Sequence, residues 1–351
     1  MVVARIAFLN KPNDLVIKEI EIKNLKSDEV LVNIKAAGIC GSDVECFEGK
    51  SAEGRYDIAP YTPGHEWAGE VVEVGTDVKI FKPGDKVTGD CVLPCGYCRS
   101  CKEGLMPSAC LNMREAGFRP DSPGGMGEYL VMEQNYLHKI PDSWSFEEGA
   151  LVEPFSIGYF GAWGNNGYVD ASDNVVIFGA GTIGLCALIV AKASRAKIIV
   201  VEPLENRRNL AKKFGADCVI DPKNSNVVDE VMKFTEGIGG NLVIEASGND
   251  KAIAMIFDVA AHSARVRLIG HSIGRKIPVE IGKTIWKTLL ITGSGGVRNF
   301  LPRTIVFMDR IRNEINIKDI ISHRYSFDEI HHAFKKAIEE KAAAIKVMLV
   351  F

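Results

Sequence analysis

Three evenly spaced cysteines, with a fourth beyond them, are the residues with the clearest chemistry. Two residues separate Cys95 from Cys98 and Cys98 from Cys101, and Cys110 follows. Four thiolates from one loop can surround a zinc ion tetrahedrally and leave no open position, which is typical of a structural site. Cys91 is a spare thiol that could replace Cys110 as the fourth ligand. Free thiols in a surface loop are the alternative, but they would be prone to oxidation.

A second set of metal-ligating residue types lies outside this cluster. Cys40, His65, Glu66 and Glu153 offer one thiolate, one imidazole and one or two carboxylates. Such a set can hold zinc with an open coordination position, as catalytic sites do. Each residue alone has an ordinary structural explanation, but the set and the cysteine cluster together favour a catalytic zinc. Asp43 is the expected acceptor for the second ring nitrogen of His65.

A glycine-rich motif begins halfway along the chain, after the buried apolar run at 175–178. An apolar stretch that reads as a helix follows it. In this motif the first glycine permits a tight turn, the second admits a pyrophosphate and the third lets helix pack on strand. The motif residues expected to face a dinucleotide are Gly179, Gly181, Thr182, Ile183 and Gly184.

The remaining cofactor contacts are predicted beyond this motif. Glu202 ends the next apolar run and is expected to accept from both ribose hydroxyls, which favours NAD. Arg207 could instead pair with the 2′-phosphate of NADP. Gly270 is a candidate for the nicotinamide pocket, although a glycine that ends a strand is often only part of a turn.

The elements that must position these groups change in type near residue 155. Residues 1 to about 155 read as short strands broken by turns, an all-β pattern. From about residue 173, strands and helices alternate, which predicts a parallel, doubly wound sheet. From about residue 295 the chain is predicted to return to the first domain. We therefore expect an α/β domain joined to a β domain.

The composition excludes several functional classes. At 351 residues, the chain is long enough for two domains. A net charge of −3 gives no electrostatic reason to expect nucleic acid as a partner. No apolar run approaches the roughly 20 residues that a membrane span needs, and the N-terminal residues lack a signal-peptide pattern. We expect a cytoplasmic protein whose nine cysteines stay reduced.

The order of these motifs resembles that of the zinc-dependent medium-chain alcohol and polyol dehydrogenases. The resemblance rests on Gly64-His65-Glu66-x-x-Gly69-x5-Gly75, the cysteine cluster and the glycine motif, and it covers essentially the whole chain. It implies a GroES-like catalytic domain, residues 1–156 and 295–351, and an inserted Rossmann NAD-binding domain, residues 157–294. It also implies a homodimer or homotetramer, with an edge strand near 291–297 as one means of association.

The resemblance also implies a ligand set and a branch of the family. Cys40, His65 and Glu66 would be zinc ligands, with Glu153 a ligand or near neighbour. Many alcohol dehydrogenases have a cysteine where Glu153 stands, whereas a glutamate resembles the sorbitol and threonine dehydrogenases. The polyol branch often has a histidine where this chain has Glu45, so the same proton relay is not implied.

The predicted reaction is oxidation of a secondary hydroxyl of a sugar alcohol to a ketose, with one catalytic zinc, one structural zinc and NAD. Ser42 is placed to pass a proton toward solvent. Asp43 and Glu66 are the other predicted catalytic residues. Candidate walls of the substrate pocket are Tyr56, Trp67, Phe118, Phe155 and Trp286.

Two alternatives stay open. The first is an L-threonine-type or sugar-phosphate-alcohol dehydrogenase, in which a cation would anchor the carboxylate or phosphate. Its candidate anchors, each also explicable as a surface charge, are Arg55, Arg119, Arg298 and His323. The second is a non-catalytic NAD-binding sensor, which predicts a damaged metal site, whereas all four expected ligands are present.

Overall fold

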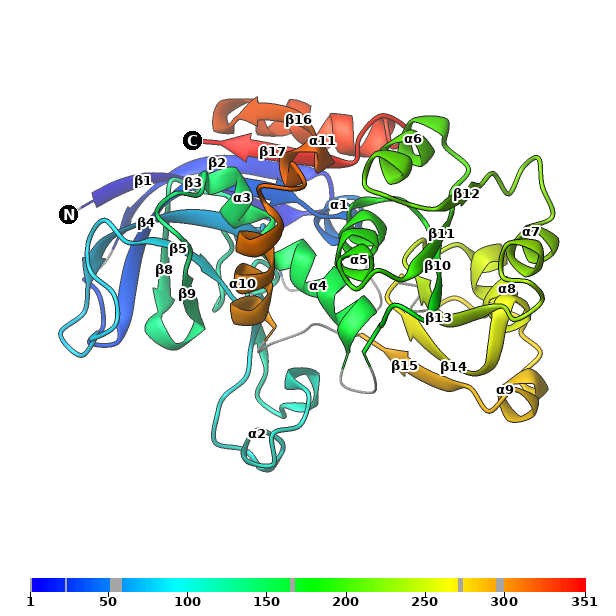
Figure 1. Ribbon diagram of the computed structural model, residues 1–351. Helices are drawn as coiled ribbons and strands as arrows, with labels where there is room; N and C mark the ends of the chain where they lie inside the picture. The colour runs from blue at the N-terminus through cyan, green and yellow to red at the C-terminus, as the bar shows by residue number, and fades with distance from the viewer. Residues whose placement is uncertain (1, 23, 51–58, 165–167, 271–273, 295–299) are drawn as a thin grey trace. The chain divides into compact units, whose positions relative to one another are not determined.

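The computed structural model describes residues 2–22, 24–50, 59–164, 168–270, 274–294 and 300–351 (Figure 1). They form two compact units, one of Met1–Glu153 with Gly296–Phe351, called unit 1 here, and one of Pro154–Gly295, called unit 2. The candidate anchors Arg55 and Arg298 and the candidate wall residue Tyr56 lie outside the described residues. Within those ranges, no helix combines the length and the apolar character that a membrane crossing requires.

Unit 1 is built on a seven-stranded sheet ordered β16-β17-β3-β4-β5-β9, with β8 also paired to β3. Its strands are β3 (Glu29–Ile39), β4 (Glu66–Val74), β5 (Lys86–Gly89), β8 (Tyr129–Glu133), β9 (Leu137–Lys139), β16 (Ile321–Ser326) and β17 (Lys346–Val350). Unit 1 also has two separate two-stranded sheets, namely β1 (Val2–Lys11) with β2 (Asp14–Ile22) and β6 (Val92–Leu93) with β7 (Arg114–Glu115).

Short helices connect the strands of unit 1. They are α1 (Gly41–Phe47), α2 (Arg99–Lys102), η1 (Pro107–Ala109), η2 (Gln134–Tyr136), α3 (Phe146–Ala150), α10 (Leu301–Ile311), η3 (Ile317–Ile320), η4 (Phe327–Glu329) and α11 (Ile330–Glu339). The strand β17 runs antiparallel to β3, with Val347 opposite Ile39. The last apolar residues of the chain therefore share a sheet with residues near its start.

Strand β3 is central because both of its faces are covered. Val30, Val32 and Ile34 belong to one buried cluster with Trp67 of β4. Ile39 belongs to another, beside Leu349 of β17. Burial of this kind favours the nearly continuous apolar sequence that β3 shows.

Unit 2 contains a six-stranded parallel sheet ordered β12-β11-β10-β13-β14-β15. Helix α4 (Val152–Trp163) leads into this unit. The elements that follow are β10 (Asn174–Phe178), α5 (Thr182–Ala193), β11 (Lys197–Val201), α6 (Glu205–Lys213), β12 (Cys218–Ile220), α7 (Val227–Phe234), β13 (Gly240–Glu245), α8 (Asp250–Val259), β14 (Ala260–Leu268), α9 (Gly282–Trp286) and β15 (Leu290–Gly293). The predicted parallel, doubly wound sheet is confirmed.

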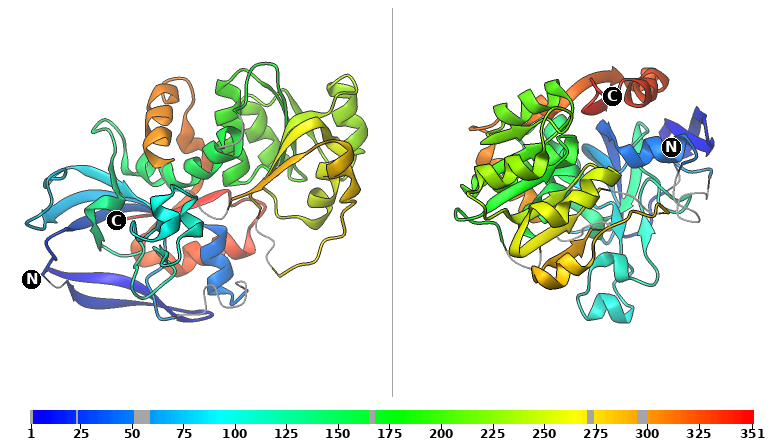
Figure 2. Two further views of the ribbon diagram at one scale, coloured as in Figure 1. Left: turned by 90° about the horizontal axis from the view of Figure 1, so that it is seen from below. Right: turned by 90° about the vertical axis from the view of Figure 1, so that its right-hand side faces the viewer.

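Helices cover both faces of this sheet, as Figure 2 shows. On one face Val176 of β10 packs in a cluster with Val231 of α7 and Ile256 of α8. On the other face, α5 lies so close to β10 that a Cβ added to Gly184 would be 3.7 Å from the Ile177 side chain and only 1.9 Å from the Gly179 carbonyl oxygen. The alternation of Val176 and Ile177 between the faces follows from the two-residue period of a strand.

Candidate active site

Two turns of unit 1 bring Cys40, His65 and Glu66 together. Cys40 follows β3 directly, and Glu66 begins β4, opposite Gly38 of β3. The antiparallel pairing of β3 with β4 thus places the end of one strand beside the start of the other. One potential ligand atom from each of the three side chains lies within 4.8 Å of those from the other two. A single metal ion fits such a set of sulfur, nitrogen and oxygen atoms.

Asp43 connects the two ligand-bearing turns. Its carboxylate accepts from the Cys40 backbone N–H at 2.8 Å and from the Gly64 backbone N–H at 3.3 Å. His65 Nδ1 lies 3.7 Å from Asp43 Oδ1, which is near but beyond hydrogen-bond distance. Burial lowers the pKa of His65, but the charges of Asp43, Cys91 and Cys40 together outweigh burial and hold the pKa well above its ordinary value.

Glu66 forms a buried ion pair with Lys346 of β17, which sequence analysis did not identify. The Lys346 ammonium contacts Glu66 Oε2 and donates to the Ile39 carbonyl at 3.1 Å. Burial lowers the pKa of Lys346, but the charges of Glu66, Cys40 and Asp43 together outweigh burial and raise it. A Cβ on Gly38 would lie 2.2 Å from Glu66 Oε2, so only glycine there leaves room for the pair.

Two buried atoms of the group lack a hydrogen-bond partner. His65 Nδ1 and Glu66 Oε1 are shielded from solvent and find no hydrogen-bond partner among the described residues. A buried polar atom without a partner costs free energy, and coordination of Glu66 Oε1 to a metal would remove that cost. The three residues therefore fit the metal that their types predict.

Glu153 lies near this group without being one of its three members. It is in the first turn of α4 and is 7% exposed. Burial raises its pKa to about 7, helped by the charge of Glu66 and opposed by that of His65. Its role as a ligand or as a neighbour of the ligands stays a prediction.

Ser42 and Phe118 also border the group. Ser42 is half-buried in the first turn of α1, two residues after Cys40. The Phe118 ring packs against the His65 ring, with 4.9 Å between centroids. Of the other predicted wall residues, Trp67 is buried in the core and Trp286 is 76% exposed.

The cysteine cluster gathers as a second group. Potential ligand atoms of Cys95, Cys98, Cys101 and Cys110 all lie within 4.8 Å of one another. Burial acts to raise the pKa of Cys95, but backbone N–H groups of Tyr97 and Cys98 outweigh it and lower the pKa to about 6. A low thiol pKa favours the thiolate that zinc requires.

Cys91 is not part of that group. Its thiol contacts the Ala116 carbonyl at 3.9 Å. Burial raises the pKa of this thiol, while the charge of His65 opposes the rise. Glu153 and Cys40 also act on its pKa, so Cys91 borders the Cys40–His65–Glu66 group instead.

The glycine motif of unit 2 borders a cavity of about 740 Å³. The predicted cofactor residues that line it are Gly179, Gly181, Glu202 and Arg207. Thr182, Ile183 and Gly184 start α5, and Gly270 lies against Gly248, where a Cβ would be 2.3 Å from the Gly248 nitrogen. These four are not among the residues that line this cavity.

Glu202 is held in place at the cavity by backbone groups. Its carboxylate accepts from the Ala180 N–H at 2.7 Å and the Leu204 N–H at 2.9 Å. Each oxygen keeps acceptor capacity for a ribose hydroxyl. Arg207 lies on α6, and burial lowers its pKa while the charge of Glu202 opposes that shift.

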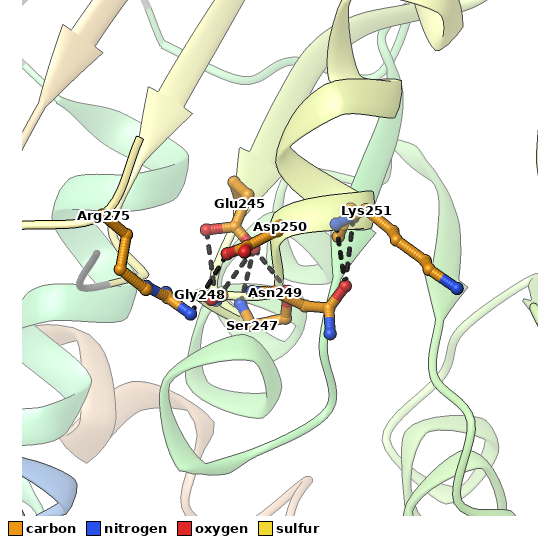
Figure 3. Close-up of polar contacts among 8 residues, drawn as sticks. Glu245, Ser247, Gly248, Asn249, Asp250, Lys251 and Arg275 are labelled. Atoms are coloured by element: carbon orange, nitrogen blue, oxygen red, sulfur yellow. Dashed lines mark hydrogen bonds and ion pairs between the residues drawn. The ribbon is translucent and has the colours of Figure 1, made fainter. Parts of the chain in front are cut away.

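The loop after β13 forms another part of the cavity wall, and sequence analysis did not identify what holds it (Figure 3). The Glu245 carboxylate accepts from the Ser247 and Gly248 backbone N–H groups at 2.9 and 3.0 Å. Arg275 donates to the Gly248 carbonyl at 2.5 Å and pairs with Asp250 at 3.1 Å. These bonds fix the loop that leads into α8.

Comparisons with known proteins match both units. The model of the alcohol dehydrogenase GroES-like domain matches residues 26–142, and that of zinc-binding dehydrogenases matches residues 182–310. Sorbitol dehydrogenase from Bacillus subtilis strain 168 is 30% identical over 345 residues, covering 98% of this chain and 96% of the relative. L-threonine 3-dehydrogenase from Pyrococcus furiosus is 36% identical over 343 residues, covering 94% of each chain.

A solved structure agrees over nearly the full length. A crystal structure of an alcohol dehydrogenase from Escherichia coli CFT073, complexed with NADH, has a TM-score of 0.90 to this chain. It is 29% identical in sequence and covers 99% of each chain.

Proposed function

The chain belongs to the zinc-type medium-chain alcohol dehydrogenase family, and on that premise we propose that it oxidises a secondary hydroxyl of a polyol to a ketone, with NAD as the acceptor. Membership makes it an NAD(P)-dependent oxidoreductase that acts on CH–OH groups. The polyol, the preference for NAD and the roles of single residues are the proposal.

The Cys40–His65–Glu66 group is the observation that carries this proposal. Its side-chain types fit zinc, and the buried Glu66 Oε1 has no hydrogen-bond partner in the described part of the chain. When bound, zinc lowers the pKa of a substrate hydroxyl, and NAD accepts the hydride. A glutamate at position 153, as in the Val152-Glu153-Pro154 segment, supports a polyol substrate because fewer thiolates leave zinc more electrophilic.

The chain's own residues position the ligands and move the proton. Asp43 holds the Cys40 and Gly64 backbones, and so fixes the thiol and the imidazole relative to each other. Lys346 fixes one oxygen of Glu66, and no described residue forms a hydrogen bond with the other oxygen, Oε1. Ser42 takes the proton of the substrate hydroxyl and passes it toward solvent.

Replacing Ser42 tests this proton path. Ser42→Ala should lower kcat on the order of 100-fold, because a positioned proton acceptor is lost. Ser42→Thr keeps the hydroxyl and is the matched control. Zinc content should be equal in both variants. Unchanged kcat in Ser42→Ala would remove Ser42 from the path.

Glu202 supports NAD over NADP. A buried carboxylate at the ribose position accepts from the hydroxyls and repels a 2′-phosphate. We expect kcat/KM to be higher with NAD than with NADP. A clear preference for NADP would overturn this part and would point to Arg207 as the phosphate partner.

A substrate screen tests the function itself. Zinc-loaded protein is mixed with NAD and with polyols, amino-alcohols and sugar phosphates, and NADH formation is followed by absorbance. We expect turnover with at least one polyol and none after Cys40→Ala. Activity that survives the loss of this metal site would refute the proposal.

We further propose that the chain forms a homodimer through α9 and β15. Strand β15 lies at the edge of the described sheet. Beside it, Ile281, Ile285 and Trp286 are 64%, 84% and 76% exposed. An edge strand can pair with its own copy across a two-fold axis, which would bury these side chains.

A further inference from the structure

The guanidinium of Arg119 has no partner among the described residues of unit 1. The side chain is half-buried, and its Nε atom is shielded from solvent with no hydrogen-bond acceptor in reach. The nearest acid along the chain, Asp121, is exposed, and its carboxylate lies 3.3 Å from the Ser122 hydroxyl that donates to it. A partly buried cation without an anion costs free energy, which a bound anion would offset.

Arg119 follows the residue that covers the metal-ligand group. The Phe118 ring packs on the His65 ring. Gly117 immediately precedes Phe118. Its backbone lies so close to Gly64 that a Cβ added to Gly117 would be 3.0 Å from the Gly64 carbonyl carbon. This loop therefore forms a wall of the candidate active site.

The loop holds Arg119 in a closed turn. The Ser122 N–H donates to the Arg119 carbonyl at 3.1 Å, and the Gly117 N–H donates to the Ser122 carbonyl at 2.9 Å. Further along, the Gly125 N–H donates to the Gly64 carbonyl at 2.7 Å. Both ends of the loop thus lie against the segment that carries His65, and the backbone of Arg119 is held in the turn that follows Phe118.

We propose that Arg119 binds an anionic group of the alcohol that this chain oxidises, so that the substrate carries a carboxylate or a phosphate beside its hydroxyl. A guanidinium forms paired, charge-assisted hydrogen bonds with either anion. Lys346, the other cation described at the site, is already paired with Glu66. A neutral polyol leaves Arg119 without a partner, and a site built for an anion discriminates against ligands that lack one. This inference rests on the zinc- and NAD-dependent oxidation of a secondary hydroxyl proposed above: a phosphate would narrow the polyol class, whereas a carboxylate would replace the polyol by a hydroxy acid such as threonine.

Two matched pairs of alcohols test the inference. Sorbitol is compared with sorbitol 6-phosphate, and L-threoninol with L-threonine, because the members of each pair differ in the anionic group. Steady-state kinetics with NAD are measured for the wild-type protein, Arg119→Gln, Arg119→Lys and Arg303→Gln. Arg303 is an exposed residue of α10 and provides the matched control.

The wild-type protein should prefer the anionic member of one pair, and which pair shows the preference identifies phosphate or carboxylate. Arg119→Gln should raise KM for that member about 10- to 100-fold, as expected for loss of a hydrogen-bonded charge, and leave the neutral member unchanged. Arg119→Lys should restore part of the affinity. Calorimetric titration of the zinc-loaded protein with inorganic phosphate gives a readout without turnover, and binding should weaken in Arg119→Gln if the anion is a phosphate.

Each negative result has a distinct meaning. If the neutral and anionic members react equally well and Arg119→Gln changes neither, the inference is wrong and the proposed function stands. If zinc-loaded wild-type protein oxidises no alcohol in the screen with NAD or NADP, the proposed function fails and the inference fails with it. If Arg119→Gln does not fold, Arg119→Lys decides, because an unchanged KM there contradicts paired binding.

Discussion

The buried carboxylate of Glu66 depends on a cation from a distant part of the chain. Lys346→Met should lower the free energy of unfolding by about 3–5 kcal/mol, because it leaves Glu66 buried without its counter-ion. Denaturant unfolding of the zinc-loaded protein measures this. Lys336→Met is the control, since Lys336 pairs with the exposed Glu340 and should contribute less than about 1 kcal/mol. Equal, small losses in both variants would show that the Lys346 pair contributes no more than a surface pair.

The types of the residues were the main sequence evidence for the candidate active site. Their spacing was informative only for ligands that lie close together in the sequence. Cys40, His65 and Glu66 are chemically distinctive, so their types alone indicated a metal site. Lys346 is 280 residues from Glu66, and no local pattern connects them. Glycine is likewise required at position 38 because a Cβ there would collide with Glu66 Oε2, and the sequence of β3 does not reveal this contact. Such features depend on tertiary packing.

At the scale of elements, two glycines of one motif should have separable effects. A Cβ at Gly184 would lie 1.9 Å from the Gly179 carbonyl oxygen, so Gly184→Ala should force α5 away from β10 and lower the thermal midpoint. At Gly181 the only described atom within 4 Å of an added Cβ is Arg207 Nη1, at 3.7 Å. Gly181→Ala should therefore leave the thermal midpoint nearly unchanged.

The methyl group that Gly181→Ala adds should weaken cofactor binding instead. It would occupy the space through which backbone approaches a pyrophosphate, so the Kd for NAD should rise at least about 10-fold. Fluorescence titration with NAD and a thermal melt of the free protein measure the two effects. If Gly181→Ala binds NAD as tightly as the wild-type protein, the pyrophosphate does not lie at this turn.

Element type was easier to predict than element length. The alternating strands and helices of unit 2 were clear because parallel strands buried on both faces are nearly continuous apolar runs. Two-residue strands such as β6 and β7 carry too few residues to show a period. After Ser326 the chain forms η4 and then α11, because Ser326 and Glu329 cap a tighter first turn.

At the scale of the whole molecule, two metal sites should give two zinc ions per chain. Cys98→Ser should lower the zinc content from two ions to one and make the loop at 95–110 more sensitive to protease, because a tetrahedral site that loses a thiolate no longer holds its loop. Cys218→Ser is the control, since Cys218 lies in β12 outside both ligand groups. Elemental analysis measures the content. One zinc per chain in the wild-type protein, lost altogether in Cys98→Ser, would contradict a site at Cys40.

Association should depend on the exposed apolar side chains beside β15. Trp286→Glu should shift the molecular mass in light scattering from that of a dimer to that of a monomer, because a charge in a buried interface lacks a partner. Val306→Glu, at another exposed apolar position, is the control. A mass unchanged by Trp286→Glu would place the contact elsewhere or show that the chain is a monomer.

The long separation between Glu66 and Lys346 has a consequence for how the protein is made. All of unit 2 leaves the ribosome after Glu66 and before Lys346. At about 5–20 residues per second, this delay is on the order of 15–60 s. Unit 2 is a continuous stretch of chain and can fold during that time, whereas the sheet that holds the metal ligands waits for its last strand. Unit 2 can therefore fold before unit 1 is complete, and the environment of the Cys40–His65–Glu66 group is assembled last.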